Sequence, residues 1–141
     1  MVACPDCGGK SCEDHFHQML FWEAEFPELG VVHHYLVLCY HLQHPRLYSA
    51  ETLPTAKQML GEFLAGTTPQ QMREKLHRQV DSGKRTHTIT GTPASFGRYQ
   101  NPVQWTLTAQ DVVAAGTEAY LVMVERWAQS IYRALQTSSN L

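Results

Sequence analysis

The sequence lacks the long apolar segments that would place it in a membrane or on a secretory route. No apolar run approaches the roughly 20 residues that a membrane-spanning helix needs. The first residues, MVACPDCGGK, do not show the basic region followed by an apolar stretch that is typical of a secretory signal. We therefore expect a soluble protein that resides in the cytoplasm.

The sequence also lacks an excess of charge of one sign. Its formal net charge is −2 and its pI is near 6.4. Broad electrostatic binding to nucleic acid or to an anionic membrane needs a basic face. The composition therefore disfavours nucleic acid and membranes as partners, and it names no other partner. A hydrophobic content of 43% is ordinary for a soluble globular chain.

Short catalytic signatures are absent from the sequence as well. It contains no G-x-S-x-G, no H-E-x-x-H, and no Walker or dinucleotide-binding fingerprint. No catalytic residue can therefore be assigned. A Gly- and Thr-rich stretch carries basic and aromatic residues that could hold a phosphate or cover a groove, but no motif supports that use and we favour a solvated surface loop. These residues are Lys84, Arg85, His87, Arg98 and Tyr99.

The length and the hydrophobic periodicity predict a single, mainly α domain over residues 1–141, built as a helical bundle. We expect a Cys-rich turn over 1–11, helices over 12–80, a long irregular loop over 81–105 with a short β piece at 86–90, and C-terminal helices over 106–136. A homodimer through the last helix is compatible with this pattern.

Proline and capping residues locate the helix ends. The first helix is expected over 12–26, before Pro27, and the second over about 31–44, before Pro45. A third should run from Ser49 or Thr52 to Gly66. Thr68 with Gln71, and Thr108 with Asp111, have the spacing of capping boxes, which predicts that two further helices begin there.

The strongest local motif is the segment CPDCGG at residues 4–9. Two cysteines separated by two residues and followed by glycine can direct two thiolates at one metal ion. Cys12 supplies a third thiol five residues after Cys7. In a reducing compartment such cysteines are more often metal ligands than disulfides. A redox pair is the alternative, but no strand precedes Cys4 as that motif requires.

The second cluster is HHYLVLCYHLQHP at residues 33–45. On a helix its four histidines, His33, His34, His41 and His44, fall within roughly a 100° arc. His33 and His44 lie about 16 Å apart along the axis, so the four cannot share one ion. One or two of them could complete the cysteine site while the others line a polar groove. A purely local set of Cys4, Cys7, Cys12 and His15 is also open.

These residues resemble an uncharacterised bacterial family, the domain of unknown function 5946. The similarity rests on CPDCGG, on Cys12 with Phe16, on the Val-His pair at 32–33 that leads to YHLQHP, and on ERWAQSIYRAL near the end. It covers roughly residues 4–45 and 105–133. The resemblance implies no known activity. It does imply the importance of seven residues: Cys4, Cys7, Cys12, His33, Tyr40, Gln43 and His44.

The resemblance favours His33 and His44 over His34 and His41, and it disfavours His15. Leu38 departs from the family, which would place an acidic residue there. Thiolate and imidazole ligands together suit zinc. The sequence therefore predicts a zinc site with four ligands. The candidates for these ligands are Cys4, Cys7, Cys12, His33 and His44.

The function predicted from the sequence is that of a binding or interaction module. The zinc would tie the N-terminal turn to the His-rich helix. The alternative is a zinc-dependent enzyme of a hydrolase-like kind, in which three protein ligands leave one metal position open for water beside the histidine face.

Overall fold

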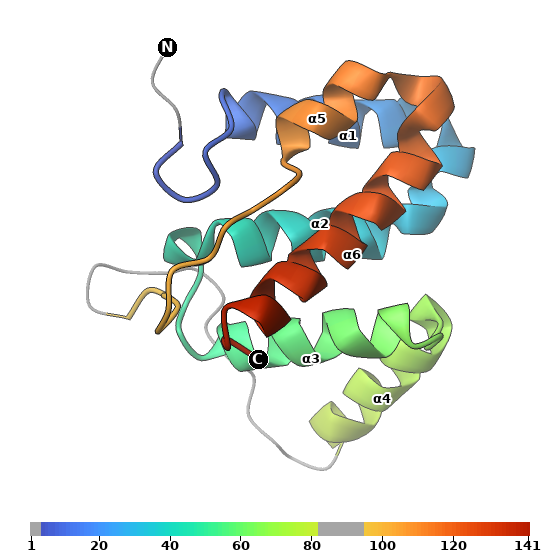
Figure 1. Cartoon of the computed structure of the whole chain (residues 1–141). Helices are drawn as coiled ribbons and strands as arrows, with labels where there is room; N and C mark the ends of the chain where they lie inside the picture. Colours follow the sequence, from blue (N-terminus) through green and yellow to red (C-terminus); the bar gives the residue numbers. More distant parts are fainter. Residues whose placement is uncertain (1–3, 82–94) are drawn as a thin grey trace.

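The structure, a computed structural model, describes residues 4–81 and 95–141 and is built from helices (Figure 1). The mainly α prediction is confirmed. Within the described residues the α-helices are α1 (Cys12–Glu25), α2 (His33–Gln43), α3 (Thr52–Leu64), α4 (Pro69–Asp81), α5 (Ala109–Ala115) and α6 (Tyr120–Thr137). Short 3-10 helices join some of them: η1 (Pro27–Val32), η2 (Pro45–Leu47) and η3 (Thr117–Ala119).

Prolines set the ends of the first two helices. Pro27 is the first residue of η1, and Pro45 is the first residue of η2. A proline fixes its own φ and disfavours the α region for the residue before it. The second helix begins at His33 rather than at 31, because residues 27–32 form the 3-10 turn that Pro27 starts.

Both predicted capping boxes are present. The Thr68 amide donates to Gln71 Oε1 at 2.9 Å, and the Gln71 amide donates to Thr68 Oγ1 at 3.1 Å. At the start of α5, the Thr108 amide donates to Asp111 Oδ2 at 2.9 Å. These contacts satisfy amides that have no partner inside the helix.

Helix α2 occupies the middle of the molecule. Helix α6 crosses it, α1 and α5 lie together on one side of it, and α3 lies on the other (Figure 1). The core contains Met19 from α1, Leu36 from α2 and Leu60 from α3, packed around Trp127 of α6. Nearly the whole C-terminal half of α2 is buried. Its last residues are therefore held in place by the surrounding helices.

The segment 95–108 has no α-helix and runs from the vicinity of α3 to the start of α5 (Figure 1). It agrees with the predicted loop where it is described. An isolated antiparallel bridge joins Phe96 to Ser49. The expected β piece at 86–90, together with Lys84, Arg85 and His87, lies outside the described residues.

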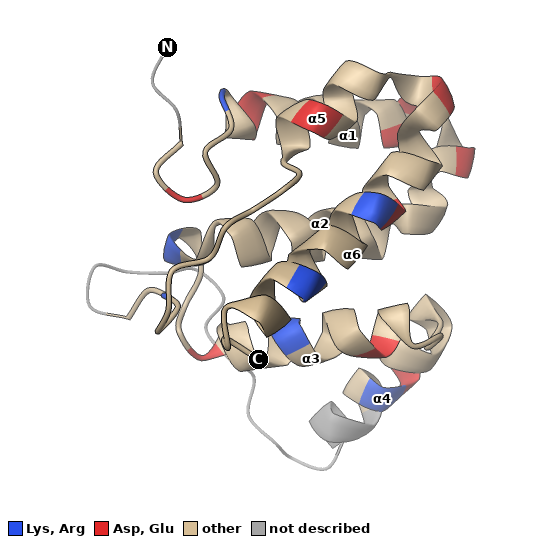
Figure 2. Cartoon of the chain, in the orientation of Figure 1, with Lys and Arg blue, Asp and Glu red and all other residues tan. Residues whose placement is uncertain are grey.

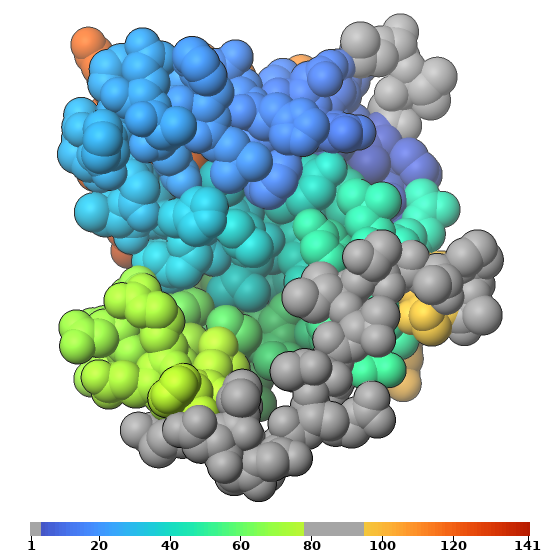
Figure 3. Space-filling model, turned by 180° about the vertical axis from the view of Figure 1, so that it is seen from behind, coloured from blue at the N-terminus to red at the C-terminus, as the bar shows by residue number. Residues whose placement is uncertain are grey.

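Acidic residues gather on α1, which carries Glu13, Asp14, Glu23 and Glu25 and no Lys or Arg, whereas α6 carries both signs (Figure 2). Seen from behind, α1 covers the upper part of the surface, α2 shows in the middle, and α4 lies in the lower part (Figure 3). None of the described helices combines the length and the apolar content that crossing a membrane requires.

Candidate metal centre

Residues 4–9 form a tight turn that points two sulfur atoms inward. The Cys4 amide donates to the Gly9 carbonyl at 2.7 Å, and the Gly8 amide donates to the Cys4 carbonyl at 2.9 Å. Gly8 has φ 79°, a conformation that favours glycine. Within the turn, the Asp6 amide lies 3.4 Å from Cys4 Sγ and the Gly9 amide lies 3.4 Å from Cys7 Sγ. Such amides stabilise negative charge on the sulfurs.

Helix α1 brings the third thiol to the same place. Cys12 is the first residue of α1, and the preceding residue, Ser11, has φ 52°. This left-handed residue turns the chain so that Cys12 Sγ lies 3.2 Å from Cys7 Sγ. No Cys–Cys disulfide is formed among the four cysteines.

His44 supplies the nitrogen. It is the residue at which α2 ends, and Pro45 follows it. Its Nδ1 lies 2.8 Å from the Tyr40 carbonyl oxygen, which can only accept a hydrogen bond. Nδ1 must therefore carry the proton, and the lone pair is on Nε2. That Nε2 atom is buried and has no hydrogen-bond partner among the described residues. This tautomer and orientation are those of a histidine that ligates a metal through Nε2.

The ligand atoms of Cys4, Cys7, Cys12 and His44 all lie within 4.8 Å of one another. Tetrahedral coordination with Zn–S bonds of about 2.3 Å separates the ligand atoms by roughly 3.5–3.8 Å. The cluster therefore needs only small adjustments to surround one ion. Four donors, three of them sulfur, form a Cys₃His group that could hold a metal ion.

Burial changes the proton affinity of these groups. Desolvation, and then the neighbouring sulfurs, raise the pKa of Cys12 far above its usual value, and burial also raises the pKa of Cys7. Burial lowers the pKa of His44, which keeps its imidazole neutral. A cation entering the cluster must therefore displace thiol protons, whereas the histidine is already in its ligating form.

The walls of the cluster are apolar on one side and polar on the other. The Tyr40 ring lies 4.3 Å from the His44 ring, and Phe16 stacks on Tyr40 at 4.1 Å. On the other side a Cβ atom at Gly9 would meet Thr108 Oγ1 at 3.0 Å. The turn is therefore fitted closely against the start of α5.

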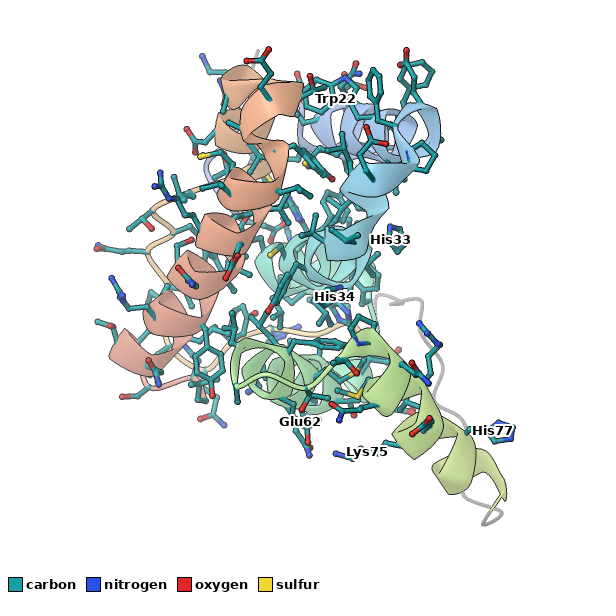
Figure 4. The ribbon with its side chains drawn as sticks, turned by 90° about the vertical axis from the view of Figure 1, so that its right-hand side faces the viewer. Trp22, His33, His34, Glu62, Lys75 and His77 are labelled. Carbon is teal, nitrogen blue, oxygen red and sulfur yellow. The ribbon has the colours of Figure 1, made fainter. Side chains whose placement is uncertain are left out.

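The other histidines of residues 33–44 do not join this cluster. Nδ1 of His33 lies 2.7 Å from Glu23 Oε1, and the side chain points away from the helices (Figure 4). His34 lies between α2 and α3, 4.5 Å from the Phe63 ring (Figure 4). His41 stacks on Tyr48 at 4.0 Å. Each histidine therefore contacts a different neighbour. The prediction that these histidines line one polar groove is wrong.

The reason for this correction is that α2 lies in the middle of the bundle. A helical wheel treats the arc of a helix as one surface. Here Glu23 of α1 pairs with the exposed side chain of His33 at one end of the arc, and Tyr48 with Thr52 of α3 covers His41 toward the other end. His33 and His44 occupy opposite ends of α2, and only His44 reaches the cysteines. His15 is also outside the group of converging donors, although its buried Nδ1 has no partner among the described residues.

Sequence reasoning missed three residues that support the site. Asp6 accepts hydrogen bonds from Arg46, at 2.9 Å and 3.1 Å, and its carbonyl accepts one from Trp105 Nε1 at 2.9 Å. These contacts span up to 99 residues of sequence, so no local pattern indicates them. Gln43, which the family resemblance singled out, is fully buried between the Leu107 carbonyl and the Trp127 indole.

Fold and site together define a helical protein with a Cys₃His cluster at the junction of its N-terminal turn and its central helix. The model of a family described as "Family of unknown function (DUF5946)" matches residues 2–136. The chain belongs to this family, in agreement with the resemblance found from its motifs. No curated protein and no solved structure matches the chain.

Proposed function

We propose that the protein binds one zinc ion through Cys4, Cys7, Cys12 and His44, and that the ion has a structural role. The observation that carries the proposal is the buried Nε2 of His44, which lacks a partner among the described residues and lies beside three thiols. Leaving a buried nitrogen unpaired costs about 1–3 kcal/mol, and an ion in the cluster would remove that cost. Thiolate and imidazole donors together suit zinc.

The number of protein donors supports the structural role. Four protein ligands complete a tetrahedron, and catalytic zinc sites typically have three and a bound water. The enzymatic alternative requires an open position, which a Cys₃His set does not leave. The ion would join the N-terminal turn to the end of α2. We infer that the protein works as a binding module in a reducing compartment such as the cytoplasm, with the ion preserving its shape.

Metal analysis of the untagged protein tests the proposal. We expect about one zinc per chain in the wild type. Replacing zinc with Co²⁺ should give the intense d–d absorption of tetrahedral cobalt, together with sulfur-to-cobalt charge transfer. An octahedral cobalt spectrum, or a wild type that contains no metal when purified under reducing conditions, would overturn the proposal.

Two matched pairs of variants locate the ligands. His44→Gln should lose the zinc, whereas His33→Gln, at the other end of the same helix, should keep it. Cys12→Ala should lose zinc, whereas Cys39→Ala should keep it, because Cys39 is buried in the apolar core away from the cluster. Zinc that persists in His44→Gln with unchanged cobalt spectra would exclude His44 as a ligand.

A further inference from the structure

A hollow of about 450 Å³ lies directly beside the cysteine turn. Its wall includes Pro5 and Asp6 from the turn, Arg46 from η2, and Arg98, Tyr99 and Trp105 from the irregular segment. Small-molecule sites in proteins usually have volumes of about 300–1,000 Å³. The hollow is therefore large enough for a small ligand, and none of the four metal donors lines it.

Two aromatic rings in the wall are held in fixed orientations. The Tyr99 hydroxyl donates to the Leu42 carbonyl at the end of α2, and the Trp105 indole N–H donates to the Asp6 carbonyl. The two rings meet edge to face, with centroids 6.0 Å apart. Because their polar atoms are already engaged, they offer apolar ring surface to a ligand rather than hydrogen bonds.

The two arginines of the wall differ in whether an acidic side chain neutralises their charge. Arg46 is paired with the Asp6 carboxylate. Arg98 lies 4.6 Å from the centre of the Phe96 ring and forms no ion pair with the side chains described at residues 4–77 and 95–141. Since Arg46 and Asp6 cancel, the wall has one positive charge in excess. A guanidinium group with free N–H donors favours a planar or tetrahedral oxyanion.

From these contacts we propose that the hollow binds a small aromatic molecule that has a carboxylate or phosphate group, with the anion at Arg98 and the ring against Tyr99 and Trp105. Arg98 provides the charge that selects an anion. The rings provide the surface that selects a flat apolar body over a bare inorganic ion. The binding module would thus recognise small aromatic anions.

Asp6 connects this hollow to the metal centre. Its amide faces Cys4 Sγ, its carbonyl holds Trp105, and its carboxylate holds Arg46. A change in the cysteine turn therefore moves two parts of the wall at once. The zinc-bound protein should bind the aromatic anion more tightly than the metal-free protein. This coupling rests on the proposed structural zinc, whereas the ligand class does not.

Nitrogen-15 NMR of the full chain tests the ligand class. The zinc-loaded protein, free of excess zinc, is titrated separately with benzoate, phenyl phosphate, inorganic phosphate and neutral benzamide. We expect benzoate or phenyl phosphate to shift the Trp105 indole resonance, and to bind more tightly than either inorganic phosphate or benzamide. The tighter of the two aromatic probes identifies the anionic group.

Arg98→Gln should weaken binding of that probe about tenfold or more, because a charge-assisted contact is lost. The control is Arg133→Gln, which removes an arginine on α6 that is also exposed and that lines a different hollow. Equal binding by the two variants would overturn the proposal. So would inorganic phosphate or benzamide that binds as tightly as the aromatic anions, or a Trp105 resonance that none of the probes moves.

The same titration on Cys12→Ala separates the two proposals. Binding that is weaker in this variant supports the coupling, and unchanged binding contradicts it. A wild-type protein that holds zinc but does not bind the aromatic anions would refute the ligand site alone. A wild type that binds them without ever holding zinc would refute the structural metal alone.

Discussion

His44 differs from the other histidines of residues 33–44 in what its two ring nitrogens face. One nitrogen donates to the Tyr40 carbonyl, and the other faces three thiols. The backbone of α2 therefore sets the tautomer, and the end of the helix at Pro45 sets the direction of the ring. Inside an α-helix the carbonyl four residues back accepts the residue's own amide. The His44 amide donates to the His41 carbonyl instead, which leaves the Tyr40 carbonyl for the imidazole.

His41 gives a prediction about pH. Burial lowers its pKa to about 4, from 6.5 in the unfolded chain, so folding favours the neutral ring. Its contribution to stability is present above pH 6.5 and is lost as the pH falls towards 4. The full loss is on the order of 3 kcal/mol. His41→Phe, which keeps the stacking on Tyr48, should flatten the dependence of unfolding free energy on pH over this range.

The measurement is urea unfolding of the wild type and the variant at several pH values, both loaded with zinc. The metal ligands titrate equally in the two proteins, so the difference between the curves isolates His41. A difference that is constant between pH 4 and pH 6.5 would show that His41 does not titrate as its burial requires.

Gly9 gives a prediction about packing at the turn. In Gly9→Ala the new Cβ would lie 3.0 Å from Thr108 Oγ1 and 3.5 Å from Cys7 Sγ. We expect a loss of about 1–3 kcal/mol in unfolding free energy, and weaker zinc binding measured by competition with a chromophoric chelator. Gly30→Ala is the matched control, because a Cβ there meets nothing within 4 Å among the described residues. Equal effects of the two substitutions would refute the prediction.

At the level of helices, Gln43 joins three parts of the fold. Its Nε2 donates to the Leu107 carbonyl at 2.7 Å, and its Oε1 accepts from Trp127 Nε1 at 3.1 Å. One side chain of α2 thereby holds both α6 and the segment that leads into α5. Its position next to His44 means that the end of α2 is fixed both by the bundle and by the candidate metal ligand.

Gln43→Leu should destabilise the protein by about 2–4 kcal/mol, because it leaves a buried N–H and a buried carbonyl without partners. Gln129→Leu, on the exposed side of α6, is the control and should change stability little. Thermal and urea unfolding measure both variants. If Gln43→Leu proved as stable as its control, the hydrogen bonds of Gln43 would be unimportant to the fold.

Most helix boundaries could be predicted because their causes are local. Pro27, Pro45 and the Thr68 and Thr108 capping boxes act within a few residues of sequence. The cysteine turn is local for the same reason. The histidine that joins the cysteines could not be predicted, since the choice depends on which helix covers which part of α2. The roles of Asp6 and Trp105 depend on a contact across 99 residues and could not be predicted either.

At the scale of the whole molecule, the cluster links the N-terminal turn to the centre of the bundle. Removing zinc with a chelator should lower the melting temperature of the wild type, because binding to the folded state alone stabilises it by mass action. Cys12→Ala should melt at a lower temperature and should not respond to the chelator. Calorimetry measures both. A wild type whose melting temperature is unchanged after verified zinc removal would contradict a structural role.

The positions of the four candidate donors also bear on how the protein is made. All of them lie between residues 4 and 44. A growing chain on the ribosome therefore contains the complete donor set well before Trp105 and Trp127 have been added. An ion captured at that stage would fix the end of α2 first, and the later aromatic residues would then dock onto an anchor that is already in place. Cellular zinc supply during translation, rather than after it, would then govern how much protein reaches its folded form.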